Sequence, residues 1–179
     1  MSRAFVNDDA ADSAADEAPE IRIPIPAGSR NYMTPEGAAM LADELAKLET
    51  MVRPKIAADI DRAGKAGSSA DTLSSLRKSL ARVDRRIEYL SRMASLADTI
   101  EPPASGYARV SFGARVTVLE PDGTERSWRI VGVDEADPER GLVGWTSPLA
   151  KALMGKEAGG VALVRLPEGS MELKVVSVG

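Results

Sequence analysis

The sequence predicts an α+β protein, in which a long antiparallel pair of helices precedes a small domain of antiparallel strands with one short helix. Two runs, residues 38–63 and 73–97, repeat apolar side chains every three or four positions, as in the seam of a coiled coil. After residue 107 the apolar spacing changes to every second residue, which is typical of strands.

Residues 1–31 are acidic and rich in alanine, and we expect them to form a disordered tail. Within this segment Ile21–Pro26 alternates apolar residues with prolines, which predicts an extended conformation. The tail therefore precedes the first structured part of the chain, which we expect at residues 32–101.

The first helix of that part has a clear beginning. Thr34 is suited to cap it, and Pro35 fits the first helical position. Its seam consists of Ala38, Leu41, Leu45, Leu48, Val52, Ile56, Ile60 and Ala63. Pro54 interrupts the pattern, because Lys55 stands where the next seam residue is due and Ile56 follows one position late. We expect a kink or a new helical segment there.

The second helix begins near residue 70, after the glycine-rich tip Gly64–Asp71, and Asp71 is a candidate cap. Its seam consists of Leu73, Leu76, Leu80, Val83, Ile87, Leu90, Ala94 and Ala97, and we expect it to continue to about residue 100. Each arm of about 30 residues spans about 45 Å. Because the apolar stripes of the two arms can bury each other within one chain, we expect a monomer. The basic outer face of this helix is interpreted as solvated rather than as a surface for an acidic partner.

Residues 102–106 contain two prolines and are expected to form a linker to a domain at residues 107–179. In that domain the pairs Val110 with Phe112 and Val116 with Val118 have strand spacing, and further strands are expected to join them through antiparallel hairpins. One short helix begins with Ser147 as its cap and ends at Gly155.

Composition restricts the chemistry of the chain. The 179 residues contain no cysteine and no histidine, which excludes disulfides, thiolate or histidine metal ligands and histidine catalysis. No enzyme motif is present, and we expect neither catalysis nor a metal or cofactor of the chain's own. The net charge of −4 gives no reason to expect sequence-specific DNA binding. Without a leader peptide or an apolar run of membrane length, the expected location is the cytoplasm.

Several motifs resemble those of the bacterial Gre transcript-cleavage factors. They are the decapeptide Ser147–Lys156, Met33–Gly37 at the first helix start, Arg53-Pro54, Asp84–Ile87, Ile130–Asp137 and, as in the GreB-like branch, Ser2–Val6. The resemblance implies an FKBP-like C-terminal domain. It also implies that this domain docks on the β′ rim of the secondary channel of RNA polymerase, while the finger enters the channel. The decapeptide assigns the rim contact to Ser147, Pro148, Ala150 and Lys151.

The finger tip departs from the family pattern. Members that stimulate cleavage carry an aspartate and a glutamate there, which help to hold the second Mg²⁺ of the polymerase. An ungapped alignment places Ala66 and Ser69 at these positions, and an alignment with one deletion retains only Asp71. The tip residues are then Lys65, Ser68, Ser69 and Asp71. We interpret the chain as a factor that binds the polymerase and modulates or inhibits transcription without stimulating cleavage.

Three alternatives remain open. A working cleavage factor could use Asp71 with Asp59 or Asp61 in a rearranged tip, and only then would polymerase-bound Mg²⁺ be involved. Asp59 and Asp61 lie two positions apart on a helix, so they face different directions, which favours solvated acids instead. A prolyl isomerase would need an aromatic pocket, for which the candidates are Tyr107, Phe112, Trp128 and Trp145. Regulation of another enzyme is disfavoured by the long finger.

Overall fold

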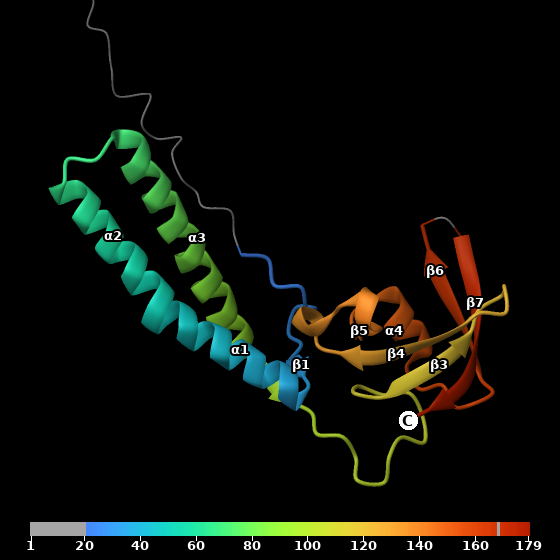
Figure 1. Ribbon diagram of the computed structural model, residues 1–179. Coiled ribbons are helices and arrows are strands. Elements are labelled where there is room, and N and C mark those ends of the chain that lie inside the picture. The colour runs from blue at the N-terminus through green and yellow to red at the C-terminus, as the bar shows by residue number, and fades with distance from the viewer. Residues whose placement is uncertain (1–20, 168) are drawn as a thin grey trace, which may run out of the picture.

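The computed structural model describes residues 21–167 and 169–179, and it contains a helical finger and a sheet domain (Figure 1). The finger consists of α1 (Pro35–Lys47), the π-helical turn η2 (Leu48–Val52), α2 (Arg53–Lys65) and α3 (Ala70–Ser95). Its two arms run side by side away from the sheet domain, so the turn between α2 and α3 lies at the far end. The predicted α+β class is confirmed.

Helix α1 begins as the sequence predicts, and its break also falls where predicted. The Thr34 hydroxyl accepts a hydrogen bond from the Gly37 N–H at 3.0 Å, and Pro35 occupies the first turn. The break is a π-helical turn, in which the Arg53 N–H donates to the Leu48 carbonyl five residues earlier. A π turn inserts one extra residue, which explains why the apolar seam slips by one position beside Pro54.

Helix α3 differs from the prediction at both ends. Ser69, not Asp71, is its N-cap, and the Ser69 hydroxyl accepts from the Thr72 N–H at 3.3 Å. The helix ends at Ser95 rather than near residue 100, because the next residues enter a strand. Ala97, which the seam pattern placed in the helix, belongs to this strand.

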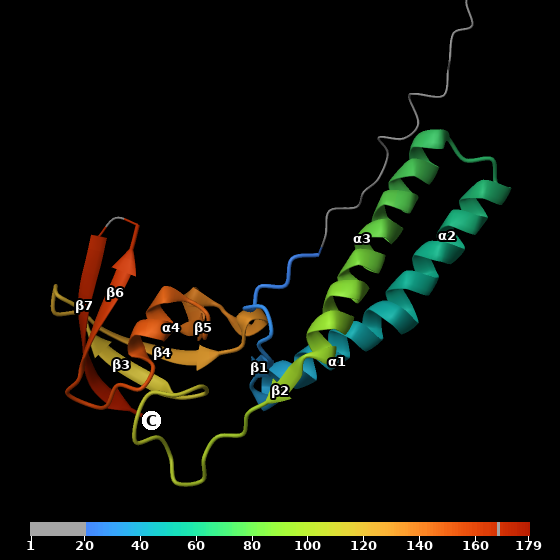
Figure 2. The ribbon, with the colours of Figure 1, turned by 180° about the vertical axis from the view of Figure 1, so that it is seen from behind.

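Two short strands close the base of the finger. Strand β1 (Asn31–Met33) precedes α1, strand β2 (Ala97–Thr99) follows α3, and the two pair in parallel (Figure 2). They flank a small core formed by Met33, Leu41, Leu90 and Met93. Ile23 and Ile25 pack against this core, so residues 21–31 are not the disordered tail that the sequence predicts. The rest of that prediction, residues 1–20, lies outside the described residues.

The sheet domain follows a loop and contains five strands in the order β5-β4-β3-β7-β6. Its elements are β3 (Arg115–Leu119), β4 (Glu125–Val131), η3 (Val133–Glu135), η4 (Pro138–Arg140), β5 (Leu142–Gly144), α4 (Pro148–Leu153), β6 (Val161–Leu166) and β7 (Gly169–Val178). Strand β5 pairs with β4 in parallel, so the sheet is mixed and the prediction of antiparallel hairpins throughout was wrong. The remaining strand pairs are antiparallel.

One face of this sheet is buried beneath α4. Val116, Val118, Ile130, Leu173 and Val175 form a single core with Ala150 and Leu153 of the helix. Val110 is buried in the same core, but residues 110–112 form no strand, which corrects the prediction made from their spacing. Within the described residues, no helix combines the length and the hydropathy needed to cross a bilayer.

Candidate functional site

The tip of the finger is a tight turn closed by backbone hydrogen bonds. The Ala66 N–H donates to Arg62 O at 3.0 Å, the Gly67 N–H to Gly64 O at 3.2 Å and the Ser68 N–H to Ala63 O at 3.0 Å. Gly67 has a φ of +66°, a left-handed conformation that favours glycine. This turn fixes the direction in which α3 begins.

The acidic side chains nearest the tip are paired within their own helix. Asp59 accepts from Arg62 at 2.9 Å, and Asp61 accepts from Lys65 at 2.7 Å. Lys65, a predicted tip residue, is therefore paired with an acid of its own helix. Asp71 is exposed on the first turn of the other arm.

The predicted tip residues therefore do not form a carboxylate pair. Ser69 uses its hydroxyl as the cap of α3 and also lies 2.9 Å from the Thr72 hydroxyl. Throughout residues 21–167 and 169–179, no three acidic side chains gather in a way that could hold a metal ion. A hard cation such as Mg²⁺ is held best by anionic oxygen ligands, and the hydroxyls of Ser68 and Ser69 are neutral.

The predicted rim segment lies at the start of α4. The Ser147 hydroxyl caps this helix by accepting from the Ala150 N–H at 3.1 Å, and Pro148 begins it. Pro148 and Lys151 are exposed, whereas Ala150 is fully buried in the core of the sheet domain. The prediction that Ala150 contacts a partner is therefore wrong for its side chain, which instead holds the helix on the sheet.

A hydrogen-bond network joins the finger to the sheet domain. The Glu135 carboxylate accepts from the Thr34 N–H at 3.0 Å, from the Thr34 hydroxyl and from the Gly132 N–H at 3.1 Å. Thr34 is also the cap of α1, so the same residue begins the finger and attaches it. The junction therefore fastens the start of the finger to the sheet domain.

Aromatic side chains pack across the same junction. Tyr32 of β1 lies edge-on to Trp145 with ring centroids 5.3 Å apart, and its ring is 6.2 Å from that of Phe112. Trp145, Phe112 and Trp128 also pack against the core of the sheet domain. Three of the four aromatic residues considered for a prolyl-isomerase pocket, Phe112, Trp128 and Trp145, are therefore used for packing.

Charged groups on the finger extend the junction outward. The Tyr89 hydroxyl donates to Asp134 at 2.6 Å, and burial together with this bond raises the pKa of Tyr89. The Arg86 guanidinium lies 5.3 Å from the Tyr89 ring centroid and makes two 2.8 Å bonds to Glu44 across the arms. These bonds lower the pKa of Glu44 and raise that of Arg86.

Sequence reasoning did not identify the junction residues as functional. Tyr32 and Glu135 contact partners about a hundred positions away, and no periodicity or spacing reveals such pairs. The only available signal was that Asp134 and Glu135 fall within a motif shared with the Gre family.

Comparison with known proteins identifies the family. Residues 31–98 match the family described as "Transcription elongation factor, N-terminal", and residues 105–179 match "Transcription elongation factor, GreA/GreB, C-term". Transcription elongation factor GreA of Nautilia profundicola is 38% identical over 140 residues, which cover 76% of this chain and 86% of that protein. Transcription elongation factor GreB of Neisseria meningitidis serogroup B is 33% identical over 84% of this chain and 94% of that protein. The chain belongs to the GreA/GreB family of transcription elongation factors.

Among solved structures, GreA factor homolog 1 (Gfh1) of Thermus thermophilus is 24% identical and covers 84% of this chain and 99% of that chain, with a TM-score of 0.39.

Proposed function

We propose that the chain binds RNA polymerase at its secondary channel and modulates or inhibits transcription without stimulating transcript cleavage. The sheet domain would dock on the β′ rim through Ser147, Pro148 and Lys151, and the finger would enter the channel. In this role the chain is not itself a catalyst, and the Mg²⁺ involved in cleavage belongs to the polymerase.

The observation that carries this proposal is the chemistry of the tip. Stimulation of cleavage requires an added carboxylate pair to hold a second Mg²⁺ and its attacking water. The tip offers the methyl group of Ala66 and the hydroxyl groups of Ser68 and Ser69 instead. The neighbouring acids Asp59 and Asp61 form ion pairs with basic side chains of their own helix.

The exposed rim segment supports the docking half of the proposal. Ser147 and Ala150 are committed to capping and packing α4, which presents Pro148 and Lys151 to solvent in a fixed orientation. A short helix held in this way presents a rigid surface, so little conformational entropy is lost on docking.

The first experiment measures RNA cleavage in a backtracked elongation complex of the cognate polymerase. We expect no cleavage above the polymerase's own rate with this protein alone, and suppressed cleavage when it competes with an authentic GreA factor. Cleavage stimulated by this protein and lost in Asp71→Ala would contradict the proposal and identify a working cleavage factor. Absence of both cleavage and competition would also contradict it.

A gain-of-function variant tests the tip directly. Ala66→Asp combined with Ser69→Glu adds two carboxylates at the tip and should confer measurable cleavage. The matched control, Ala58→Asp with Ser75→Glu, adds the same charge at exposed positions farther down the arms. The control should remain inactive. If the tip variant also remained inactive while still competing for the polymerase, the missing acids would not be the reason for inactivity.

The docking surface is tested by charge reversal. Lys151→Glu should weaken polymerase binding at least tenfold, while Lys174→Glu, exposed on β7, should leave it within twofold. Equal effects of the two variants would mean that binding depends on overall charge rather than on the rim segment.

A further inference from the structure

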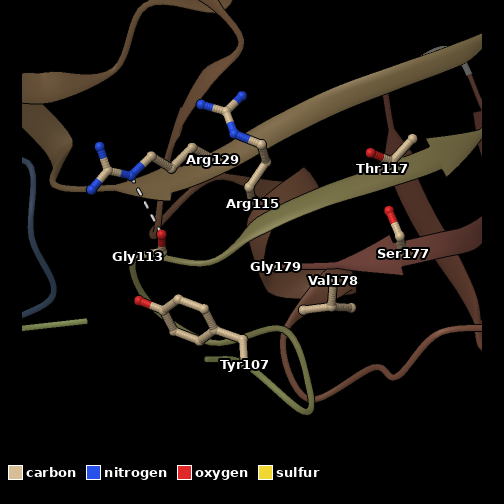
Figure 3. Close-up of a pocket in the computed structure, with 8 residues that line it drawn as sticks. All are labelled: Tyr107, Gly113, Arg115, Thr117, Arg129, Ser177, Val178 and Gly179. Atoms are coloured by element: carbon tan, nitrogen blue, oxygen red, sulfur yellow. Dashed lines mark hydrogen bonds between the residues drawn. The ribbon is translucent and has the colours of Figure 1, made fainter. Parts of the chain in front are cut away.

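The outer face of the sheet contains a cavity of about 440 Å³ (Figure 3). Strand alternation determines its lining: Val116 and Val118 point into the core, so Arg115 and Thr117 between them point outward. Arg129 of β4 is the cross-strand partner of Arg115, and Ser177 of β7 is the partner of Thr117. The cavity is separate from the finger tip and from the rim segment.

Two arginines on neighbouring strands, Arg115 and Arg129, line this cavity. Like charges directly opposite one another across strands are destabilising, so this pair has an energetic reason to attract an anion. Arg129 is held in place because its Nε donates to Gly113 O at 3.4 Å. Arg115 is exposed and makes no ion pair with any described residue.

Hydroxyl groups surround the two arginines. The Thr117 and Ser127 hydroxyls lie 2.8 Å apart, and Ser177 lines the same side of the cavity. Tyr107 closes the opposite side, with its hydroxyl so close to Gly113 that a Cβ there would lie 2.5 Å from it. Guanidinium and hydroxyl donors, as on the residues that line this cavity, are typical ligands of phosphate groups.

We propose that this cavity binds a phosphate-bearing small molecule, with Arg115 and Arg129 holding the phosphate and Tyr107 forming one wall. The volume falls within the range of about 300–1,000 Å³ that is common for small-molecule sites. The proposal does not depend on the function proposed for the finger tip.

One carboxylate would compete with the ligand. Glu36 of α1 lies 3.5 Å from Arg129, a long ion pair, and its side chain is 68% exposed. The pKa of Glu36 is lowered chiefly by its backbone hydrogen bond at the helix start and by Thr34, with a smaller contribution from Arg129. A phosphate at Arg129 would therefore replace a weak contact between the finger and the sheet domain.

The test uses the full chain and isothermal titration calorimetry at low salt without divalent ions, with inorganic triphosphate and ATP as probes. Arg115→Gln should weaken binding of both probes at least tenfold, because a charged hydrogen-bond donor is lost. The matched control Arg165→Gln removes the same charge from the exposed edge strand β6 and should leave binding within twofold. Thermal melting verifies that both variants are folded.

Glu36→Gln provides a second measurement with the opposite sign. Because it removes the competing carboxylate, it should tighten binding severalfold. Absence of binding of either probe to the unmodified protein at millimolar concentration would overturn the proposal. Equal weakening by Arg115→Gln and Arg165→Gln would also overturn it, since binding would then reflect overall charge. Tighter binding of ATP than of triphosphate, reduced by Tyr107→Leu, would extend the site to the nucleoside.

Discussion

Replacing Glu135 by alanine should loosen the attachment of the finger and destabilise the protein. The carboxylate accepts three hydrogen bonds, two from Thr34 and one from Gly132. A hydrogen bond to a charged group contributes about 1.5–3 kcal/mol, and the three share one acceptor, so their contributions do not add in full. We expect a total loss of about 3 kcal/mol, because both backbone N–H groups lose their partner.

Differential scanning calorimetry measures this loss. For a chain of this size a loss of about 3 kcal/mol lowers the melting temperature by about 6–12 °C. Glu139→Ala is the matched control, because Glu139 is exposed in the nearby η4 turn. A decrease of less than about 2 °C for Glu135→Ala, or an equal decrease for both variants, would refute the role assigned to the junction.

A double-mutant cycle makes the test sharper. A Cβ atom placed on Gly37 would clash with the Glu135 side chain, so Gly37→Ala alone should destabilise the protein. In the Glu135→Ala background the clashing side chain is absent. Gly37→Ala should then stabilise the protein by about 1 kcal/mol, because alanine has a higher helix propensity than glycine. Additive costs of the two substitutions would show that they do not act through this contact.

Three further predictions concern single side chains. Tyr89 has a raised pKa in the folded state, so an absorbance titration at alkaline pH should show a late transition that vanishes in Tyr89→Phe. The stability linked to this group should be lost as the pH rises above the unfolded pKa of about 10. Glu44 has a lowered pKa because of Arg86, so its contribution to stability is present at neutral pH and lost as the pH falls through the lowered pKa. In urea titrations Glu44→Gln should cost only about 0.5 kcal/mol at pH 7, because the pair is solvent-exposed, and nothing at pH 2. Ser147→Ala removes the cap of α4 and should cost about 1 kcal/mol, measured by the same titrations.

Local sequence signals predicted the starts of α1 and α4 and the break in the finger well. The caps Thr34 and Ser147, each followed by proline, begin helices in the structure because side-chain capping and a fixed φ act within a few residues. The one-residue slip of the seam at Ile56 likewise has a local origin, the π turn before Pro54. Spacing alone suffices where the stabilising contacts are close in sequence.

Contacts between distant segments could not be predicted in this way. The parallel pairing of β5 with β4 joins three-residue stretches, which are too short to carry a period. Asp71 was a plausible cap, but Ser69 caps the helix because the turn closes two residues earlier. At the candidate site, spacing and caps located the turn between the arms and the start of α4, and the resemblance to the Gre factors gave both a role. The burial of Ala150 and the Glu135 junction depend on the packed domain.

The distribution of buried side chains along the finger has an evolutionary consequence. The buried residues of its helices, among them Leu41, Leu90 and Met93, lie near the base, and α2 contains none. Apart from Gly67 in its left-handed conformation and the cap Ser69, substitutions near residues 64–71 therefore meet little selection for stability, since no packed core surrounds them. A lineage can exchange the residues of the tip in a few mutational steps and thereby change what the finger does, while every fold-determining contact is inherited intact.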